Sequence, residues 1–150
     1  KVYTLVFSGD GSHIASVSPD RTIKLWEVAS GQEVHAFSIG EVGMNDIAFS
    51  PDGRLLASSE VIWDVESKQV VHALERGRRD PGLVAFSPDG SLLAVKLADQ
   101  EIRLWDVASG RLVRSLSHGD EVMTVAFSPD GAILASGGYD NQIYLWGIPR

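Results

Sequence analysis

Four copies of one turn motif constrain the fold of this chain more than any other feature. Ser-Pro-Asp-Gly occurs at 50–53, 87–90 and 128–131, and the near-copy Ser-Gly-Asp-Gly occurs at 8–11. Each copy is directly preceded by a Phe and followed later by a Trp: Phe7, Phe49, Phe86 and Phe127, then Trp26, Trp63, Trp105 and Trp146. The Phe residues lie 42, 37 and 41 positions apart, and the Trp residues lie 37, 42 and 41 apart. Two landmarks in phase indicate an array of one supersecondary unit.

Each unit reads as four short strands. The segments before the turns are apolar and rich in β-formers: TLVFS, DIAFS, LVAFS and TVAFS. Each leads into Asp-Gly, which tolerates the positive φ that a tight hairpin requires. Second, third and fourth strand types follow in order, and no segment has a helical pattern. The sequence therefore predicts an all-β fold in which every repeat is a four-stranded antiparallel meander.

These motifs resemble a known family. FSPDG-x-LLAS, Leu-Trp-Asp-Val and Ala-Ser-Gly are similar to the motifs of WD-repeat β-propellers, and the similarity covers essentially all 150 residues. The resemblance implies four-stranded blades packed radially around a central channel, mostly seven or eight to a ring. About four blades are then expected here as a partial propeller, with repeats near 1–40, 41–80, 81–119 and 120–150.

The resemblance also implies a structural hydrogen-bond network of His, Ser or Thr, Asp and Trp in each blade. The fourth repeat has all four groups, the first lacks the His, and the third keeps only Asp and Trp, with Val95 and Leu97 at the Ser positions. The residues concerned are His118, Ser136, Asp140 and Trp146, then Ser16 or Ser18 with Asp20 and Trp26, then Asp99 and Trp105. A Ser packed against an indole is a poor nucleophile, so we expect no catalytic His-Ser-Asp group and no enzyme activity.

Composition narrows the range of partners. The net charge is −7, which makes a nucleic-acid backbone an unfavourable partner, and no apolar run approaches the length of a membrane helix. Cysteine is absent and the other His residues are scattered, so no metal or cofactor site is expected. The start of the chain does not read as a signal peptide, and we expect a cytoplasmic location.

The second repeat departs from the others. Phe and Trp are 14 positions apart there instead of 19, and the five-residue shortfall falls between Glu60 and Val61. Either this blade has lost the Asp turn between its second and third strands, or residues of a loop are absent from the sequence. Lys68 also stands where the first and third repeats have a turn Gly, at a position expected to need positive φ.

The number of predicted strands indicates an open array of blades and not a closed ring. The pattern predicts fifteen strands where four complete blades would have sixteen, and four blades do not readily close a ring. The chain is therefore expected to belong to something larger. It is either a piece of a longer propeller or a protomer that supplies half of an eight-bladed ring.

The leading hypothesis for function is a non-catalytic scaffold that binds a protein or peptide. The family resemblance places partners on the face formed by the fourth-to-first and second-to-third connections, and the candidate contact residues there are Glu41, Arg76, Arg78, Arg79, Asp120, Glu121 and Tyr139. The Arg cluster suits an anion or phosphopeptide, or is simply a solvated loop. The alternative is an architectural module that self-associates into a closed ring without a specific ligand.

Overall fold

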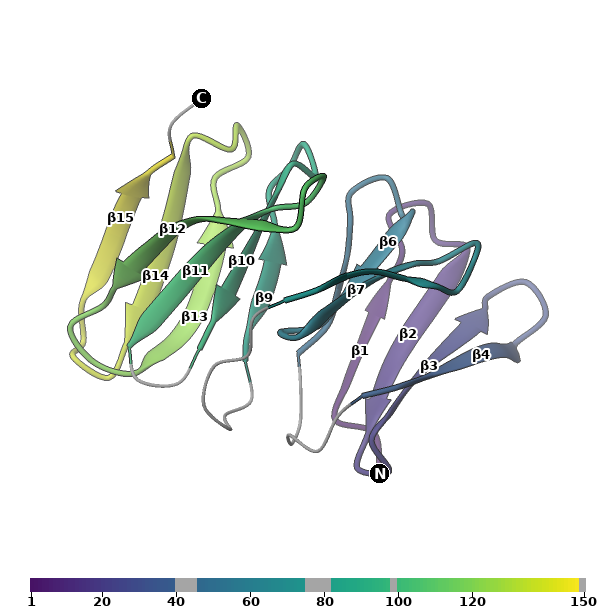
Figure 1. The fold of residues 1–150 in the computed structure, drawn as a ribbon. Coiled ribbons are helices and arrows are strands. Elements are labelled where there is room, and N and C mark those ends of the chain that lie inside the picture. Colours follow the sequence, from purple (N-terminus) through teal and green to yellow (C-terminus); the bar gives the residue numbers. More distant parts are fainter. Residues whose placement is uncertain (40–45, 75–81, 98–99, 149–150) are drawn as a thin grey trace.

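A computed structural model describes residues 1–39, 46–74, 82–97 and 100–148, and in them every regular element is a β-strand. The four repeats form four antiparallel sheets, which we call blades 1 to 4 (Figure 1). Blade 1 contains β1 (Thr4–Phe7), β2 (His13–Ser18), β3 (Thr22–Glu27) and β4 (Gln32–Ser38). Blade 2 contains β5 (Ala48–Phe49), β6 (Leu55–Ala57), β7 (Val61–Asp64) and β8 (Val70–Ala73). Blade 3 contains β9 (Val84–Phe86), β10 (Leu92–Lys96), β11 (Glu101–Asp106) and β12 (Arg111–Ser117).

Blade 4 has three strands among the described residues: β13 (Val122–Phe127), β14 (Ile133–Gly138) and β15 (Ile143–Gly147). The strands of each blade pair in chain order, so every blade is a meander. The expected all-β architecture is confirmed, with fifteen strands in the described residues. The blades follow one another in an open arc, and blades 1 and 4 lie at its two ends (Figure 1).

The repeated turn has the same geometry in all four blades. The Ser hydroxyl donates to the Asp carboxylate two residues on, at 2.6 Å in every copy. The same hydroxyl accepts the backbone N–H five residues on, at 2.9 to 3.0 Å. The turn Gly adopts a φ between 69° and 73°. Ser, Asp and Gly thus close the hairpin through local bonds that any chain with this motif can make.

In blade 2 a tight hairpin joins β6 to β7 at the site of the five-residue shortfall. Three residues, 58–60, lie between β6 and β7, and the backbone N–H of Ser58 donates to the carbonyl of Val61 at 2.9 Å, so Ser59 and Glu60 form the two-residue loop of this hairpin. The buried Ser58 hydroxyl accepts the N–H groups of Glu60 and Val61, at 3.3 and 3.2 Å. Among the described residues, the chain of this blade therefore runs continuously through the point where the other blades carry their Asp turn.

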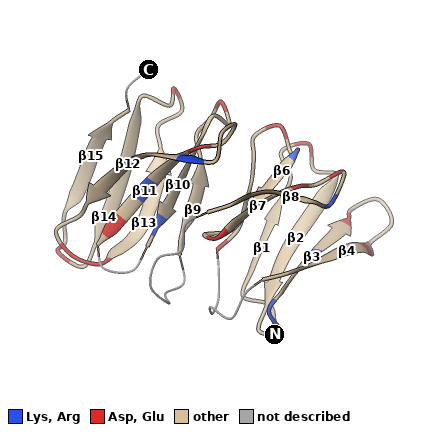
Figure 2. Cartoon of the chain, viewed as in Figure 1, with Lys and Arg blue, Asp and Glu red and all other residues tan. Residues whose placement is uncertain are grey.

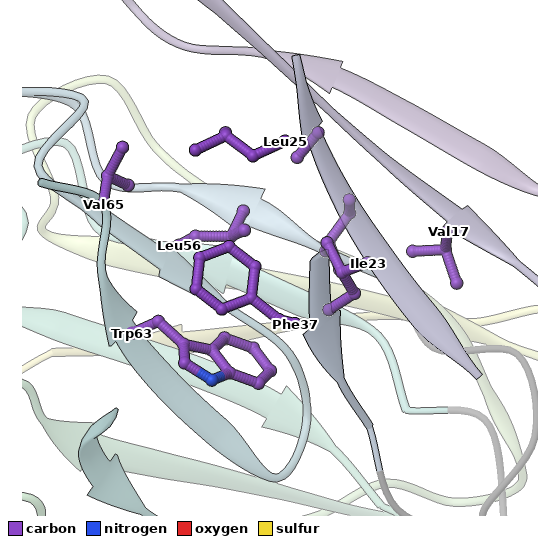
Figure 3. Close-up of a cluster of buried hydrophobic side chains, with 9 residues drawn as sticks. Val17, Ile23, Leu25, Phe37, Leu56, Trp63 and Val65 are labelled. Atoms are coloured by element: carbon purple, nitrogen blue, oxygen red, sulfur yellow. The ribbon is translucent and has the colours of Figure 1, made fainter. Parts of the chain in front are cut away.

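The cores lie between blades. Three clusters of buried apolar side chains join blade 1 to 2, 2 to 3 and 3 to 4. Figure 3 shows the first of them, in which Ile23 and Leu25 of blade 1 pack with Leu56 and Trp63 of blade 2. Phe37 from β4 reaches the same indole, with 5.3 Å between the ring centres. The blades are therefore stabilised mainly by the faces that they bury against one another.

A β-bulge recurs at the same position in each of the three four-stranded blades. In blades 1, 2 and 3 the pairing of the third and fourth strands shifts register directly before the Trp: Trp26, Trp63 and Trp105. A bulge bends the strand and turns the side chain that follows it. The recurring bulge therefore aims the Trp of each of these blades.

Candidate interaction surface

Meander topology places the loops on two faces. Because the strands alternate in direction, the Ser-Pro-Asp-Gly turns share one face with the third-to-fourth turns. The second-to-third and fourth-to-first connections share the opposite face, which we call the connection face. The candidate contact residues of the sequence belong to the connection face, and the structure describes that face best at blade 4.

The second-to-third turns are held by Asp residues. Asp20 accepts the hydroxyl of Thr22 at 2.6 Å and its N–H at 3.1 Å, and the Thr22 hydroxyl lowers the pKa of Asp20 most. Asp140 accepts the N–H of Gln142 at 3.0 Å. The residue after the Asp has positive φ in both turns: 66° at Arg21 and 59° at Asn141. Both carboxylates therefore stabilise their turns through hydrogen bonds within the turn.

A buried polar cluster underlies the connection face at blade 4. Trp146 Nε1 donates to Ser136 Oγ at 2.9 Å. The buried imidazole of His118 lies with its Nδ1 3.6 Å from Asp140 Oδ2, and its ring contacts that of Tyr144 at 4.2 Å. Burial and the charge of Asp140 raise the pKa of Tyr144. His118 Nε2 and Asp140 Oδ2 are buried without a hydrogen-bond partner, so the bonds do not run unbroken from His118 to Trp146.

The other blades keep only parts of this cluster. Trp26 Nε1 donates to Ser16 Oγ at 3.0 Å, which selects Ser16 over Ser18 as the partner in blade 1. In blade 3 the matching position is Val95, fully buried in the core between blades 2 and 3. In blade 2 the matching residue is Ser58, whose hydroxyl accepts backbone N–H groups of its own turn. Ser136 is likewise buried and bonded to an indole, an arrangement that suits packing.

Three predicted contact residues come together above the cluster. Tyr139 donates its backbone N–H to the carbonyl of Glu121 at 3.1 Å, and the N–H of Glu121 donates to Asp120 Oδ1 at 2.8 Å. The Tyr139 side chain is 62% exposed. Backbone bonding therefore joins these three residues on the connection face, and we call Asp120, Glu121 and Tyr139 together the Tyr139 patch.

Lys96 was not anticipated from the sequence. It is almost fully buried on β10, and its ammonium group lies 3.5 Å from Glu121 Oε1. The only signal in the sequence is a charge in the apolar segment LLAVKL. This contact joins Glu121, in the Tyr139 patch of blade 4, to Lys96 of blade 3.

Several candidates cannot be placed. Glu41, Arg76, Arg78, Arg79 and Asp99 lie outside the described residues. Among the residues that the structure does describe, no group of His, Asp and Glu has the arrangement of a metal site. In the same part of the chain, no helix is long and apolar enough to cross a membrane.

The turn face carries a hollow of about 340 Å³ between blades 1 and 2. Its acidic lining includes Asp10, Asp52 and Asp64. Each of these carboxylates accepts a Ser hydroxyl of its own turn, and those bonds lower all three pKa values. Charged groups are spread thinly over the strands as a whole (Figure 2).

Comparison with known proteins gives one consistent result. The family described as "WD domain, G-beta repeat" matches residues 1–27, 31–64 and 110–147, more than half of the chain. The "Anaphase-promoting complex subunit 4 WD40 domain" family matches residues 82–125. A "WD repeat domain-containing protein 83 homolog" from Dictyostelium discoideum is 23% identical over 126 residues, 83% of this chain. The chain spans only 27% of the length of that relative. With four successive blades of the matching architecture, the chain belongs to the WD-repeat family.

Proposed function

We propose that this chain is a non-catalytic binding module that holds a protein segment on its connection face, at the Tyr139 patch. WD-repeat proteins generally mediate protein–protein interaction as scaffolds. The observation that carries the proposal is the exposed side chain of Tyr139, whose backbone is bonded to that of Glu121 next to Asp120. Exposed aromatic residues on rigid supports are common anchors in interfaces.

The chemistry of the patch specifies the partner. An exposed Tyr side chain with Asp120 in the same patch suits a Lys or Arg side chain, which can pair with the acid while its stem or charge contacts the ring. The chain's net charge of −7 also favours a basic protein segment over a nucleic acid. We therefore propose a flexible, basic peptide as the ligand class. A cytoplasmic location is part of the same proposal, and microscopy of a tagged chain would check it.

A random peptide library displayed on phage tests this function. Peptides selected on the wild-type chain should be rich in Lys and Arg, and Tyr139→Ala should weaken their binding about tenfold or more. Val113→Ala is the matched control, because Val113 is also exposed but lies on β12, outside the patch. Selected peptides that bind Tyr139→Ala as tightly as wild type would overturn the proposal.

A further inference from the structure

Lys96 is a buried charge at the connection-face end of blade 3. It is the last residue of β10 and is only 4% exposed. Its ammonium group reaches blade 4, where Nζ lies 3.5 Å from Oε1 of Glu121, the residue directly before β13. Because a Lys is almost never fully buried unless it is paired, the contact with Glu121 is part of what keeps this charge in the interface between blades 3 and 4.

Packing alone does not require a charge at this position. Lys96 pairs with Ile102 in the sheet of blade 3. In blade 1 the residues at the same register are Val17 and Ile23. Val17 is 1% exposed and belongs to the apolar core between blades 1 and 2. Since an apolar side chain fits the same place in another pair of blades, the distinctive contribution of Lys96 is a positive charge next to Glu121.

The two acids of the Tyr139 patch differ in how their charges are compensated. The Glu121 carboxylate lies against the ammonium group of Lys96, and half of its side chain is exposed. Asp120 is also exposed, and its Oδ1 accepts the N–H of Glu121 at 2.8 Å. Within the described part of the chain, no Lys, Arg or His forms an ion pair with Asp120. Lys96 therefore offsets the charge of Glu121 and leaves that of Asp120 to a ligand.

We propose that Lys96 is the specificity-determining residue of the Tyr139 patch, because it leaves Asp120 as the one acid that a ligand cation meets there. This inference rests on the proposed function. The patch then recognises a single Lys or Arg of a basic peptide, whose stem or charge contacts Tyr139, and gains nothing from a second basic residue next to the first. Lys96 is buried, so it acts on the ligand through Glu121 and does not touch the ligand.

The test uses a peptide selected from a phage library on the wild-type chain, and copies of it in which each neutral neighbour of its essential basic residue is replaced by Lys. Wild type should bind the peptide and its copies equally. Lys96→Met, which keeps an unbranched side chain in the interface, frees the charge of Glu121 and should bind one of the copies about threefold more tightly than the original. Lys96→Gln should act in the same way, and circular dichroism checks the fold of both variants.

Two further variants separate charge from structure. Lys24→Met is the matched control, because it removes the same charge from an ion pair in blade 1, where Lys24 Nζ lies 2.7 Å from Glu33 Oε2. It should show no preference for the copies. Adding Glu121→Gln to Lys96→Met should abolish the threefold preference, because the carboxylate that attracts the second Lys is then gone. A purely structural effect of losing Lys96 would persist in this double variant.

The outcomes distinguish this inference from the proposed function. A library that yields no peptide, or only peptides that bind Tyr139→Ala as tightly as wild type, would overturn both. With Tyr139-dependent peptides in hand, equal binding of the original and its copies by both Lys96 variants would overturn this inference alone. The same holds for a preference that the double variant keeps or that Lys24→Met shares.

Discussion

Lys68 has backbone strain that its counterpart Gly31 avoids. Both residues end a third-to-fourth turn, and each donates its N–H to the carbonyl four residues back, at 2.9 Å for Lys68 and 2.8 Å for Gly31. Their φ values are 61° and 67°. A side chain in this left-handed region costs about 1 kcal/mol, whereas Gly adopts it freely.

Lys68→Gly should therefore raise the free energy of unfolding by about 1 kcal/mol, measured by urea denaturation. Gly31→Lys is the matched reverse change, because the added Cβ would meet nothing within 4 Å. It should lower the stability by a similar amount. A Lys68→Gly variant less stable than wild type would show that the Lys side chain contributes more than its backbone costs.

At the residue scale, local chemistry predicted some positions and missed others. The Asp-Gly turns and the positive φ at Lys68 depend on neighbours in sequence, so motif reading identifies them. Ser16 and Ser18 both lie on β2, and only the three-dimensional reach of Trp26 selects Ser16. The burial of Lys96 depends on blade 4 covering it, which no local pattern indicates.

At the element scale, the repeated turn makes folding sensitive to acid. The Ser87 hydroxyl and the N–H and hydroxyl of Ser91 bond to Asp89 and lower its pKa from 3.8 to about 2. A carboxyl with a lowered pKa in the folded state stabilises the fold above its unfolded pKa. That contribution is lost as the pH falls from about 4 to about 2.

Asp89→Asn should remove part of this acid dependence. The variant should be less stable than wild type at pH 6, and the difference between the two should shrink as the pH falls from about 4 to about 2, because Asp89 is protonated in the unfolded wild-type chain first and then increasingly in the folded one. Urea unfolding followed at several pH values measures this. A constant difference between the two proteins at all pH values would mean that the charge of Asp89 is not what holds the turn.

The strands themselves were predictable because each repeat restates the same pattern. Blade 2 is the exception, since its Trp follows its Phe by 14 positions instead of 19. A two-residue hairpin at Ser59 and Glu60 closes it, with Ser58 satisfying the backbone. The sequence located the shortfall but left its structure open, because a tight turn and a missing loop have the same Phe–Trp spacing.

At the scale of the whole molecule, the fold follows from stacking. In the residues that the structure describes, each of the three apolar clusters joins two neighbouring blades, and none lies within a single blade. The sequence predicted the repeat, the family and the open arc. The Tyr139 patch could not be predicted as a unit, because Asp120 and Glu121 meet Tyr139 only through the pairing of β13 with β14.

The most direct test of blade stacking uses the four Trp residues as reporters, in four variants that each keep one Trp and replace the others by Phe. Trp63 and Trp105 are 4% and 5% exposed, whereas Trp26 and Trp146 are only half-buried. Acrylamide should quench Trp63 and Trp105 least and Trp26 and Trp146 clearly more. Equal quenching of all four would contradict the stacked arc of blades.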